Sequence, residues 1–129
     1  MKILILEDDV LTGSMFRDEL AGAGHDVTLT HDNDTAVEVL FSGDFDLIFA
    51  DLMIDGETSI PVLDCARLFC PEAEIVLITG SSLFPNGELH FTNADIAHRI
   101  QKPVSPDELT AIAAHFERTA GPARLAVGA

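Results

Sequence analysis

Five residues, spread over most of the chain, have side chains suited to phosphoryl chemistry. They are two adjacent acids, Glu7 and Asp8, followed by Asp51, Thr79 and Lys102. Converging carboxylates repel one another, so either a cation binds them or one of them takes a proton. Their hard oxygen atoms suit Mg²⁺, which uses few protein ligands and keeps several waters. An ammonium and a hydroxyl beside them would hold a phosphoryl group on a carboxylate and neutralise its charge.

These residues follow short apolar runs that are typical of buried strands. Such runs alternate with amphipathic segments, and we predict strands at residues 2–6, 27–30, 47–50, 75–79 and 96–101. Apolar residues at helical spacing predict helices at residues 10–23, 34–41, 59–69 and 105–118. Before the last strand, Pro85, Asn86 and Gly87 favour turns, so a helix within residues 81–95 must be short or displaced.

The alternation of strands and helices predicts an α/β fold, with a parallel sheet covered by helices on both faces. Ligands of such sheets bind beyond the carboxyl ends of the strands. Glu7 and Asp8 follow the first predicted strand and Asp51 follows the third. Thr79 ends the fourth strand and Lys102 follows the fifth. We therefore expect one site to hold all five residues.

Some of the acids stand at predicted helix starts, where an aspartate normally acts as the N-cap of the helix. Asp8 or Asp9 can cap the first helix, and Asp32 or Asn33 the second. The sequence Ser-Pro-Asp-Glu at residues 105–108 is a capping box that begins the last helix. Asp9 also stays an alternative to Asp8 as metal ligand, because a one-residue shift of the first strand would exchange them.

Composition excludes several classes of function. The chain has 22 acidic and seven basic residues, a net charge of -15, which repels nucleic acid. The N-terminal apolar run is too short for a signal peptide or a membrane span. Cys65 and Cys70 fit no redox or zinc motif, and we expect core thiols in a reducing cytoplasm. We expect one domain over residues 1–118 and a flexible tail over residues 119–129.

Four segments, in their order and separations, resemble the receiver domains of two-component response regulators over residues 2–118. They read Ile-Leu-Ile-Leu-Glu-Asp-Asp, Phe-Asp-Leu-Ile-Phe-Ala-Asp-Leu-Met, Ile-Val-Leu-Ile-Thr-Gly-Ser and Gln-Lys-Pro-Val. The resemblance implies a flavodoxin-like, CheY-like fold with strand order 2-1-3-4-5. It also implies a stand-alone signalling switch rather than an enzyme. A histidine kinase or histidine phosphotransfer protein would supply the phosphoryl group, and a protein partner of unknown identity would receive the signal.

The resemblance further implies a role for each site residue. Asp51 is the phosphoacceptor, Thr79 reports phosphorylation by moving its hydroxyl, and Lys102 pairs with a phosphate oxygen. Backbone groups next to them, those of Leu52 and Gly80, would contact the phosphoryl group. The implied Mg²⁺ ligands are Asp51, Asp8, Glu7 through a water, and the backbone carbonyl of Met53.

The chain also departs from the pattern of most receivers. Asp55 and Ser59 stand where Pro and Gly are usual, and Gly80 replaces the commoner Ala. Arg99 occupies the place of an aromatic residue whose rotation couples the site to the output face. Burying an unpaired guanidinium is costly, so we expect activation to act by ordering residues 80–95 instead.

Two alternatives compete with the receiver interpretation. One is an interaction module that has kept the fold and no longer uses phosphate; the intact acids, Thr79 and Lys102 argue against it. The other is an enzyme on the same fold. A flavin carrier would need a Ser-, Thr- or Gly-rich phosphate loop where the chain has Glu7 and Asp8. A hydrolase of the haloacid type would carry Asp-x-Asp on the first strand, and that pattern is absent.

Overall fold

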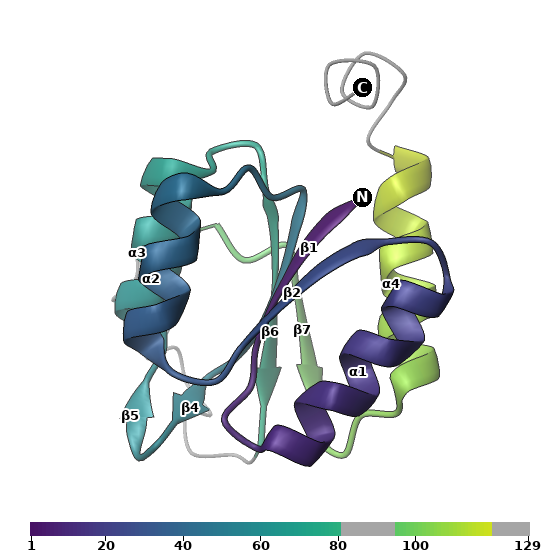
Figure 1. Ribbon diagram of the computed structural model, residues 1–129, viewed down its shortest axis with the longest axis horizontal. Coiled ribbons are helices and arrows are strands. Elements are labelled where there is room, and N and C mark those ends of the chain that lie inside the picture. The colour runs from purple at the N-terminus through teal and green to yellow at the C-terminus, as the bar shows by residue number, and fades with distance from the viewer. Residues whose placement is uncertain (81–94, 120–129) are drawn as a thin grey trace.

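A five-stranded parallel sheet forms the centre of the molecule (Figure 1). The computed structural model describes residues 1–80 and 95–119. The strands lie in the order β2-β1-β3-β6-β7, which confirms the predicted order 2-1-3-4-5. Their bounds are β1 Lys2–Leu6, β2 Asp26–Thr30, β3 Leu47–Asp51, β6 Glu74–Thr79 and β7 His98–Gln101.

Helices cover both faces of this sheet. Helices α1 and α4 lie on one face, and α2 and α3 lie side by side on the other (Figure 1). Their bounds are α1 Val10–Gly22, α2 Asn33–Ser42, α3 Ile60–Phe69 and α4 Pro106–Thr119. In the part of the chain that the structure describes, none of the helices has the length and apolarity to cross a membrane.

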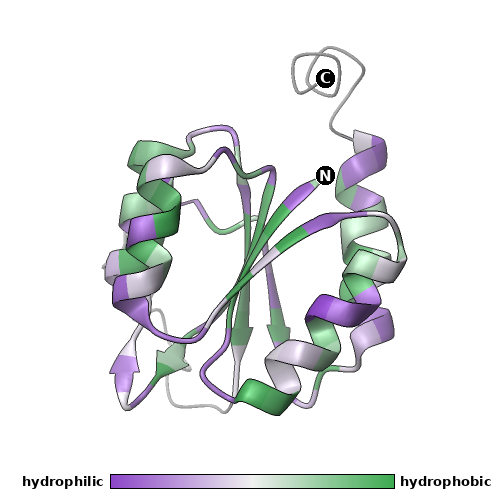
Figure 2. Cartoon of the chain, viewed as in Figure 1, coloured by the Kyte–Doolittle hydropathy of each residue, from purple (hydrophilic) through white to green (hydrophobic). Residues whose placement is uncertain are grey.

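Two layers of core follow from this arrangement, because successive side chains of a strand point to opposite faces. In β1, Ile3 and Ile5 pack under α1 and α4, whereas Leu4 and Leu6 pack under α2 and α3. The central strands are therefore apolar along most of their length, as Figure 2 shows. Continuous rather than alternating apolar runs are what a sheet covered on both faces requires.

The structure resolves the open choices at the helix starts. Asp9 caps α1, since its carboxylate accepts a hydrogen bond from Thr12 N–H at 3.2 Å. Asp32 caps α2 by accepting from Thr35 N–H at 2.7 Å. At α4 the capping box forms with long bonds: Glu108 N–H donates to Ser105 Oγ at 3.3 Å, and Ser105 N–H donates to the Glu108 carboxylate at 3.4 Å. Each of these caps satisfies helix N–H groups that have no partner within the helix.

Three features differ from the sequence predictions. Strand β7 begins at residue 98, two residues later than predicted. A short antiparallel hairpin, β4 Met53–Ile54 and β5 Glu57–Thr58, lies between β3 and α3 and was not predicted. Cys70 is buried as predicted, whereas Cys65 is only partly buried. The expectations for a fourth helix within residues 81–95 and for the tail fall almost wholly on residues 81–94 and 120–129, outside the described residues.

The hairpin turns at Asp55 and Gly56, which both have positive φ angles, 51° and 81°. Two positive φ angles in succession are characteristic of the two-residue turn that joins paired strands tightly, and an Asp-Gly pair suits it. The hairpin lies at the carboxyl end of the sheet, the end to which the arrowheads of β6 and β7 point (Figure 1). The fold thus places an extra structural element beside the predicted site.

Candidate functional site

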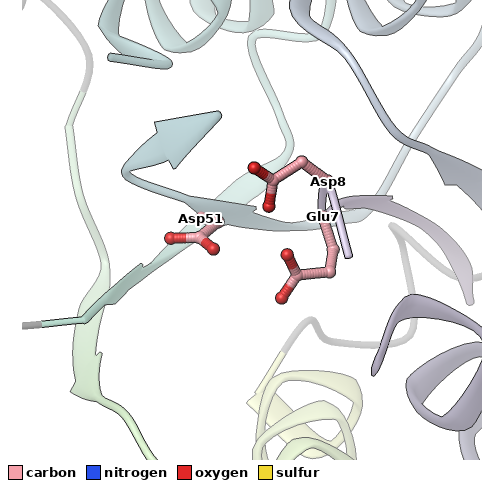
Figure 3. Close-up of side chains that lie close together, drawn as sticks. All are labelled: Glu7, Asp8 and Asp51. Atoms are coloured by element: carbon pink, nitrogen blue, oxygen red, sulfur yellow. The ribbon is translucent and has the colours of Figure 1, made fainter. Parts of the chain in front are cut away.

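Three carboxylates meet at the carboxyl end of the sheet (Figure 3). Glu7 and Asp8 follow β1, and Asp51 is the last residue of the neighbouring strand β3. One carboxylate oxygen from each residue lies within 4.8 Å of the other two. Glu7 and Asp51 are 2% and 3% exposed, whereas Asp8 is half-buried. These are hard oxygen donors at a separation that one divalent cation can span, so the residues fit Mg²⁺.

Lys102 supplies a positive charge to the same place from the segment after β7. Its Nζ lies 2.5 Å from Asp51 Oδ2 and 3.7 Å from Glu7 Oε1. Among residues 1–80 and 95–119, it is the one cation that forms an ion pair with these carboxylates. Three acids therefore face one ammonium, and the excess negative charge favours a further cation.

The pKa values reflect this imbalance. Burial raises the pKa of Glu7 to about 7, with support from its hydrogen bond to Asp8 and from the charge of Asp51. Burial acts on Asp8 in the same direction, but hydrogen bonds from Asp55 N–H and the Glu7 carboxyl lower its pKa below the usual range. Partial burial opposes the charge of Lys102, yet its bond to Asp51 raises the Lys102 pKa. The ammonium is therefore charged at neutral pH.

A backbone N–H group is directed at each of the three carboxylates. Asp9 N–H donates to Glu7 Oε2 at 3.1 Å, and Asp55 N–H donates from the hairpin turn to Asp8 Oδ2 at 3.0 Å. Met53 N–H makes a long contact of 3.4 Å with Asp51 Oδ1. The carboxylates are thus oriented by main-chain groups whose positions the fold fixes, which is the usual way to pre-organise a binding site.

The backbone after Asp51 distinguishes the roles of Leu52 and Met53. Leu52 N–H donates to Ile78 O at 2.8 Å, and Leu52 O accepts from Ser59 N–H at 2.8 Å. Both polar backbone groups of Leu52 are therefore already paired, and its side chain is buried in the core. The amide that faces the Asp51 carboxylate belongs to Met53 instead, because successive residues of an extended chain alternate in direction. The geometry favours Met53 over Leu52 as the donor to a group on Asp51.

The remaining predicted residues lie around this centre in different ways. Thr79 is half-buried, and its hydroxyl makes a long 3.4 Å hydrogen bond to Ile100 O rather than one to the acids. Gly80 is exposed beside the Lys102 side chain, whose Cδ would lie 3.7 Å from an added Cβ. Asp9 is occupied as the α1 cap and is not part of the three-acid group, so Asp8 rather than Asp9 joins Glu7 and Asp51.

Sequence reasoning missed one buried residue at this site, Ser59. It was expected only to begin α3, but its hydroxyl donates to Asp51 O at 2.7 Å. A serine just before a helix that has a proline in its first turn is a normal start signal, so the pattern gave no hint of this bond. The Arg99 side chain, in contrast, is exposed on the edge strand β7, where a charged residue is easily accommodated.

A pocket of about 480 Å³ opens beside the carboxylates. Its walls come from the start of α1 and from the segment that leads from β7 to α4. Its lining residues are Glu7, Asp8, Asp9, Thr12, Phe16, Ile78, Gly80, Lys102, Pro103 and Val104. Glu7, Asp8 and Lys102 are therefore reachable from one side of the molecule.

Comparisons with known proteins agree with this geometry. The chain is 28% identical over 111 residues to the transcriptional regulatory protein DltR of Streptococcus agalactiae, an alignment that covers 86% of this chain and 49% of DltR. It thus spans about half the length of that relative. A CheY-like receiver domain protein from Methanospirillum hungatei superposes with a TM-score of 0.78 at 23% identity, over 91% of this chain and 94% of that one.

A response regulator protein from Burkholderia pseudomallei, solved with a phosphorylated aspartic acid, a calcium ion and citrate, has the same fold. Its TM-score is 0.73 at 19% identity, over 94% of this chain and 75% of that one. The family model described as response regulator receiver domain matches residues 3–114. Such domains are signalling modules that work through a phosphoaspartate, and the group Glu7, Asp8 and Asp51 resembles their phosphorylation site. The chain belongs to the response regulator receiver domain family.

Proposed function

We propose that this receiver accepts a phosphoryl group on Asp51 and passes the signal on through protein–protein contact. The observation that carries the proposal is the group of three carboxylates within 4.8 Å of one another, with Lys102 Nζ 2.5 Å from Asp51 Oδ2. A buried acid with a fixed ammonium beside it is a competent acceptor, because the negative charge of the incoming phosphoryl group is neutralised as it transfers.

The transfer forms one bond and breaks one. A carboxylate oxygen of Asp51 attacks phosphorus, and the bond from phosphorus to the donor's histidine nitrogen breaks, with its electron pair remaining on the imidazole. Lys102 is well placed to neutralise a phosphoryl oxygen, since its raised pKa keeps it charged. The Met53 amide faces the acceptor, and Gly80, which lines the pocket beside Lys102, would supply a second backbone donor.

Mg²⁺ is the cofactor that this donor set suits. We propose Asp8 and Asp51 as direct ligands, Glu7 as a ligand through water and the Met53 carbonyl as a further one. When bound, the ion would supply positive charge to the transferring oxygens. Among residues 1–80 and 95–119, the Thr79 hydroxyl makes one hydrogen bond, a long one of 3.4 Å to Ile100 O, which it can exchange for a bond to a phosphoryl oxygen.

The phosphoryl donor is proposed to be a histidine kinase or a histidine phosphotransfer protein, as the family implies. A donor imidazole would approach through the pocket lined by Glu7, Asp8 and Lys102, because Lys102 Nζ in turn contacts Asp51. Three apolar side chains on the first turns of α1, Val10, Leu11 and Met15, are at least half-exposed next to Asp9 and Thr12, which line that pocket. An apolar surface at the entrance of a polar site is typical of a protein contact.

Acetyl phosphate with Mg²⁺, followed by intact-mass measurement, tests the acceptor. The wild type should gain the mass of one phosphoryl group, and Asp51→Asn should gain none. Asp55→Asn is the matched control: it lies in the same loop, its backbone N–H remains, and Asn tolerates the positive φ. Modification of Asp51→Asn would assign the acceptor to another residue. A wild type that is never modified would favour the phosphate-independent interaction module.

Titration with Mg²⁺ tests the metal site separately. Asp8→Ala removes a directly ligating charge and should weaken Mg²⁺ binding about tenfold or more. Asp9→Ala removes an acid one residue away that serves as the α1 cap, and should weaken binding far less. Equal losses in the two variants would mean that the acids act only through their long-range charge.

A further inference from the structure

Ser59 is completely buried, and its hydroxyl reaches the backbone of the proposed phosphoacceptor. The residue is 0% exposed, and Ser59 Oγ donates to Asp51 O at 2.7 Å. A buried hydroxyl costs free energy unless it is paired, so this bond is a defined part of the structure.

The placement of Ser59 suggests that its hydroxyl does not serve the helix. Ser59 is the residue before α3, where a serine side chain usually accepts a hydrogen bond from the first turn. No such bond is made by Ser59, whereas Ser105 makes one at the start of α4. The Ser59 hydroxyl is directed to Asp51 instead, so its contribution is to the strand end that carries the acceptor.

With this bond, the peptide group between Asp51 and Leu52 is held at both of its polar atoms. Asp51 O accepts from Ser59 Oγ, and Leu52 N–H donates to Ile78 O of β6 at 2.8 Å. A peptide group is planar, so fixing its oxygen and its nitrogen fixes the plane. The orientation of this plane sets the ψ angle of Asp51 and therefore the direction in which its carboxylate leaves the backbone.

Ser59 is itself held by rigid neighbours. Its N–H donates to Leu52 O at 2.8 Å, and Thr58, the residue before it, pairs with Met53 in the β4–β5 hairpin. The Asn33 side chain at the start of α2 donates to Thr58 O at 3.2 Å. The backbone that carries the hydroxyl is thus held by Leu52 just after β3, by the hairpin and by α2, as a residue that positions another must be.

We propose that Ser59 is a positioning residue for phosphoryl transfer, which fixes the direction of the Asp51 carboxylate through the Asp51–Leu52 peptide group. The inference rests on the proposed role of Asp51 as acceptor. A small misplacement of a reacting group lowers the rate of a transfer steeply, even when the group remains present. Ser59 therefore acts on the rate of phosphorylation at saturating Mg²⁺ and phosphodonor, and not only on stability.

The test compares three variants of the full chain by their rate of modification with saturating acetyl phosphate and Mg²⁺. Ser59→Ala removes the donor, and Ser59→Cys replaces the hydroxyl with a somewhat larger thiol, which is a much weaker donor. Thr30→Val is the matched control, because Thr30 Oγ1 is a buried donor to a strand carbonyl, Ile5 O, at 2.8 Å. We expect the rate to fall about tenfold in Ser59→Ala and by a smaller factor in Ser59→Cys.

The control should keep its rate within about twofold while its unfolding midpoint drops as far as that of Ser59→Ala, since both lose one buried hydroxyl bond. Rates of the two Ser59 variants equal to that of Thr30→Val would overturn the inference and leave the acceptor role of Asp51 intact. If Ser59→Ala does not fold, Ser59→Cys decides, because its thiol leaves no cavity. A wild type that takes no phosphoryl group would overturn both proposals.

Discussion

Strand β3 and the segment after β7 each bring one partner of the Asp51–Lys102 ion pair to the site, but the two strands are built in opposite ways. All five residues of β3 are buried, and the strand is paired on both sides, with β1 and β6. Among the strands that the structure describes, β7 is paired with β6 alone, and of its four residues only Ile100 is half-buried. Asp51 ends the first strand, and Lys102 follows the second.

The difference separates two tasks within one site. An acceptor needs a fixed direction, and the central strand supplies it through ladder bonds on both edges and packing on both faces. The cation that neutralises the phosphoryl group needs only to stay close to the phosphoryl oxygens during the transfer. A long flexible side chain after an edge strand can do so. The Asp51 side of the site should therefore be sensitive to changes in core packing, and the Lys102 side mainly to changes in charge.

Truncating one core residue on each strand is the strongest test of this comparison. Phe49 on β3 is 0% exposed, so Phe49→Ala should cost about 3–5 kcal/mol of unfolding free energy. Ile100 on β7 is half-buried, so Ile100→Ala should cost only about 1–2 kcal/mol. Urea unfolding of both variants measures the two losses. Similar losses would show that the edge strand is as tightly integrated as the centre.

Removing the charge at the edge should affect chemistry more than folding. Lys102→Met keeps the apolar stem of the side chain and deletes the ammonium that contacts Asp51 and Glu7. We expect phosphorylation by acetyl phosphate to slow about a hundredfold, as with loss of one charge-stabilising donor. Mg²⁺ affinity should rise several-fold, because a competing positive charge is gone.

Lys2→Met is the control for that experiment. Lys2 lies on β1 with its ammonium over the Phe45 ring, 5.8 Å from the centroid, and it does not contact the carboxylates. Its replacement removes the same net charge and should leave the phosphorylation rate unchanged. A drop in Mg²⁺ affinity in Lys102→Met would indicate instead that the ammonium organises the acids for metal.

The stability of the metal-free protein as a function of pH tests Glu7, which is buried in the central part of the site. The pKa of Glu7 is raised from 4.5 to about 7, so the folded state keeps this proton over a range where the unfolded chain has lost it. Stability should therefore fall as pH rises from about 4.5 to 7, the opposite of the usual carboxylate. Glu7→Gln should remove this fall, and thermal unfolding at pH 5 and pH 8 with a chelator present measures it.

Asp8 provides the contrast, because its pKa is lowered in the folded state. A carboxylate of that kind adds stability above its unfolded pKa and loses it as pH falls. At pH 8, Asp8→Asn should therefore be less stable than the wild type, whereas Glu7→Gln should be more stable than the wild type. The same sign for both variants would contradict the distinction between the two neighbouring acids.

The smallest effect is expected at Gly80, and enlarging a residue on each side compares the free space beside Lys102 with that in the core around β3. A Cβ on the exposed Gly80 would meet Lys102 Cδ at 3.7 Å, an ordinary contact, so Gly80→Ala should change stability by less than about 0.5 kcal/mol. Ala50 on β3 is 0% exposed, and Ala50→Val should cost about 1–3 kcal/mol through overpacking. Thermal unfolding of the pair would show whether the centre is the more closely packed half.

The two strands also differ in how well the sequence predicted them. Strand β3 stood out because Leu47, Ile48 and Phe49 form a continuous apolar run, which is what burial on both faces requires. Strand β7 was expected two residues too early, because an exposed edge strand that includes His98 and Arg99 carries little apolar pattern. The five predicted site residues lie at the carboxyl end of the sheet, since that placement follows from strand ends alone.

The contacts that the hairpin and Ser59 make with the site could not be predicted from the apolar runs and strand ends. The Asp-Gly pair at residues 55 and 56 is a turn signal, but strands of two residues show no periodicity to mark a hairpin. The Ser59 hydroxyl and the pairing of Leu52 N–H depend on how β3, the hairpin and β6 meet in space. Sequence spacing carries no information about which of several nearby partners a polar group chooses.

The strand order also bears on the order in which the chain can fold. The adjacent strands β2, β1 and β3 all come from the first 51 residues, so they can pair before the rest of the sheet has joined. At that stage Glu7, Asp8 and Asp51 already approach one another, while Lys102 is still far along the unfolded chain. A dissolved divalent cation would relieve their repulsion, and we expect Mg²⁺ to speed refolding of the wild type more than that of Asp8→Ala.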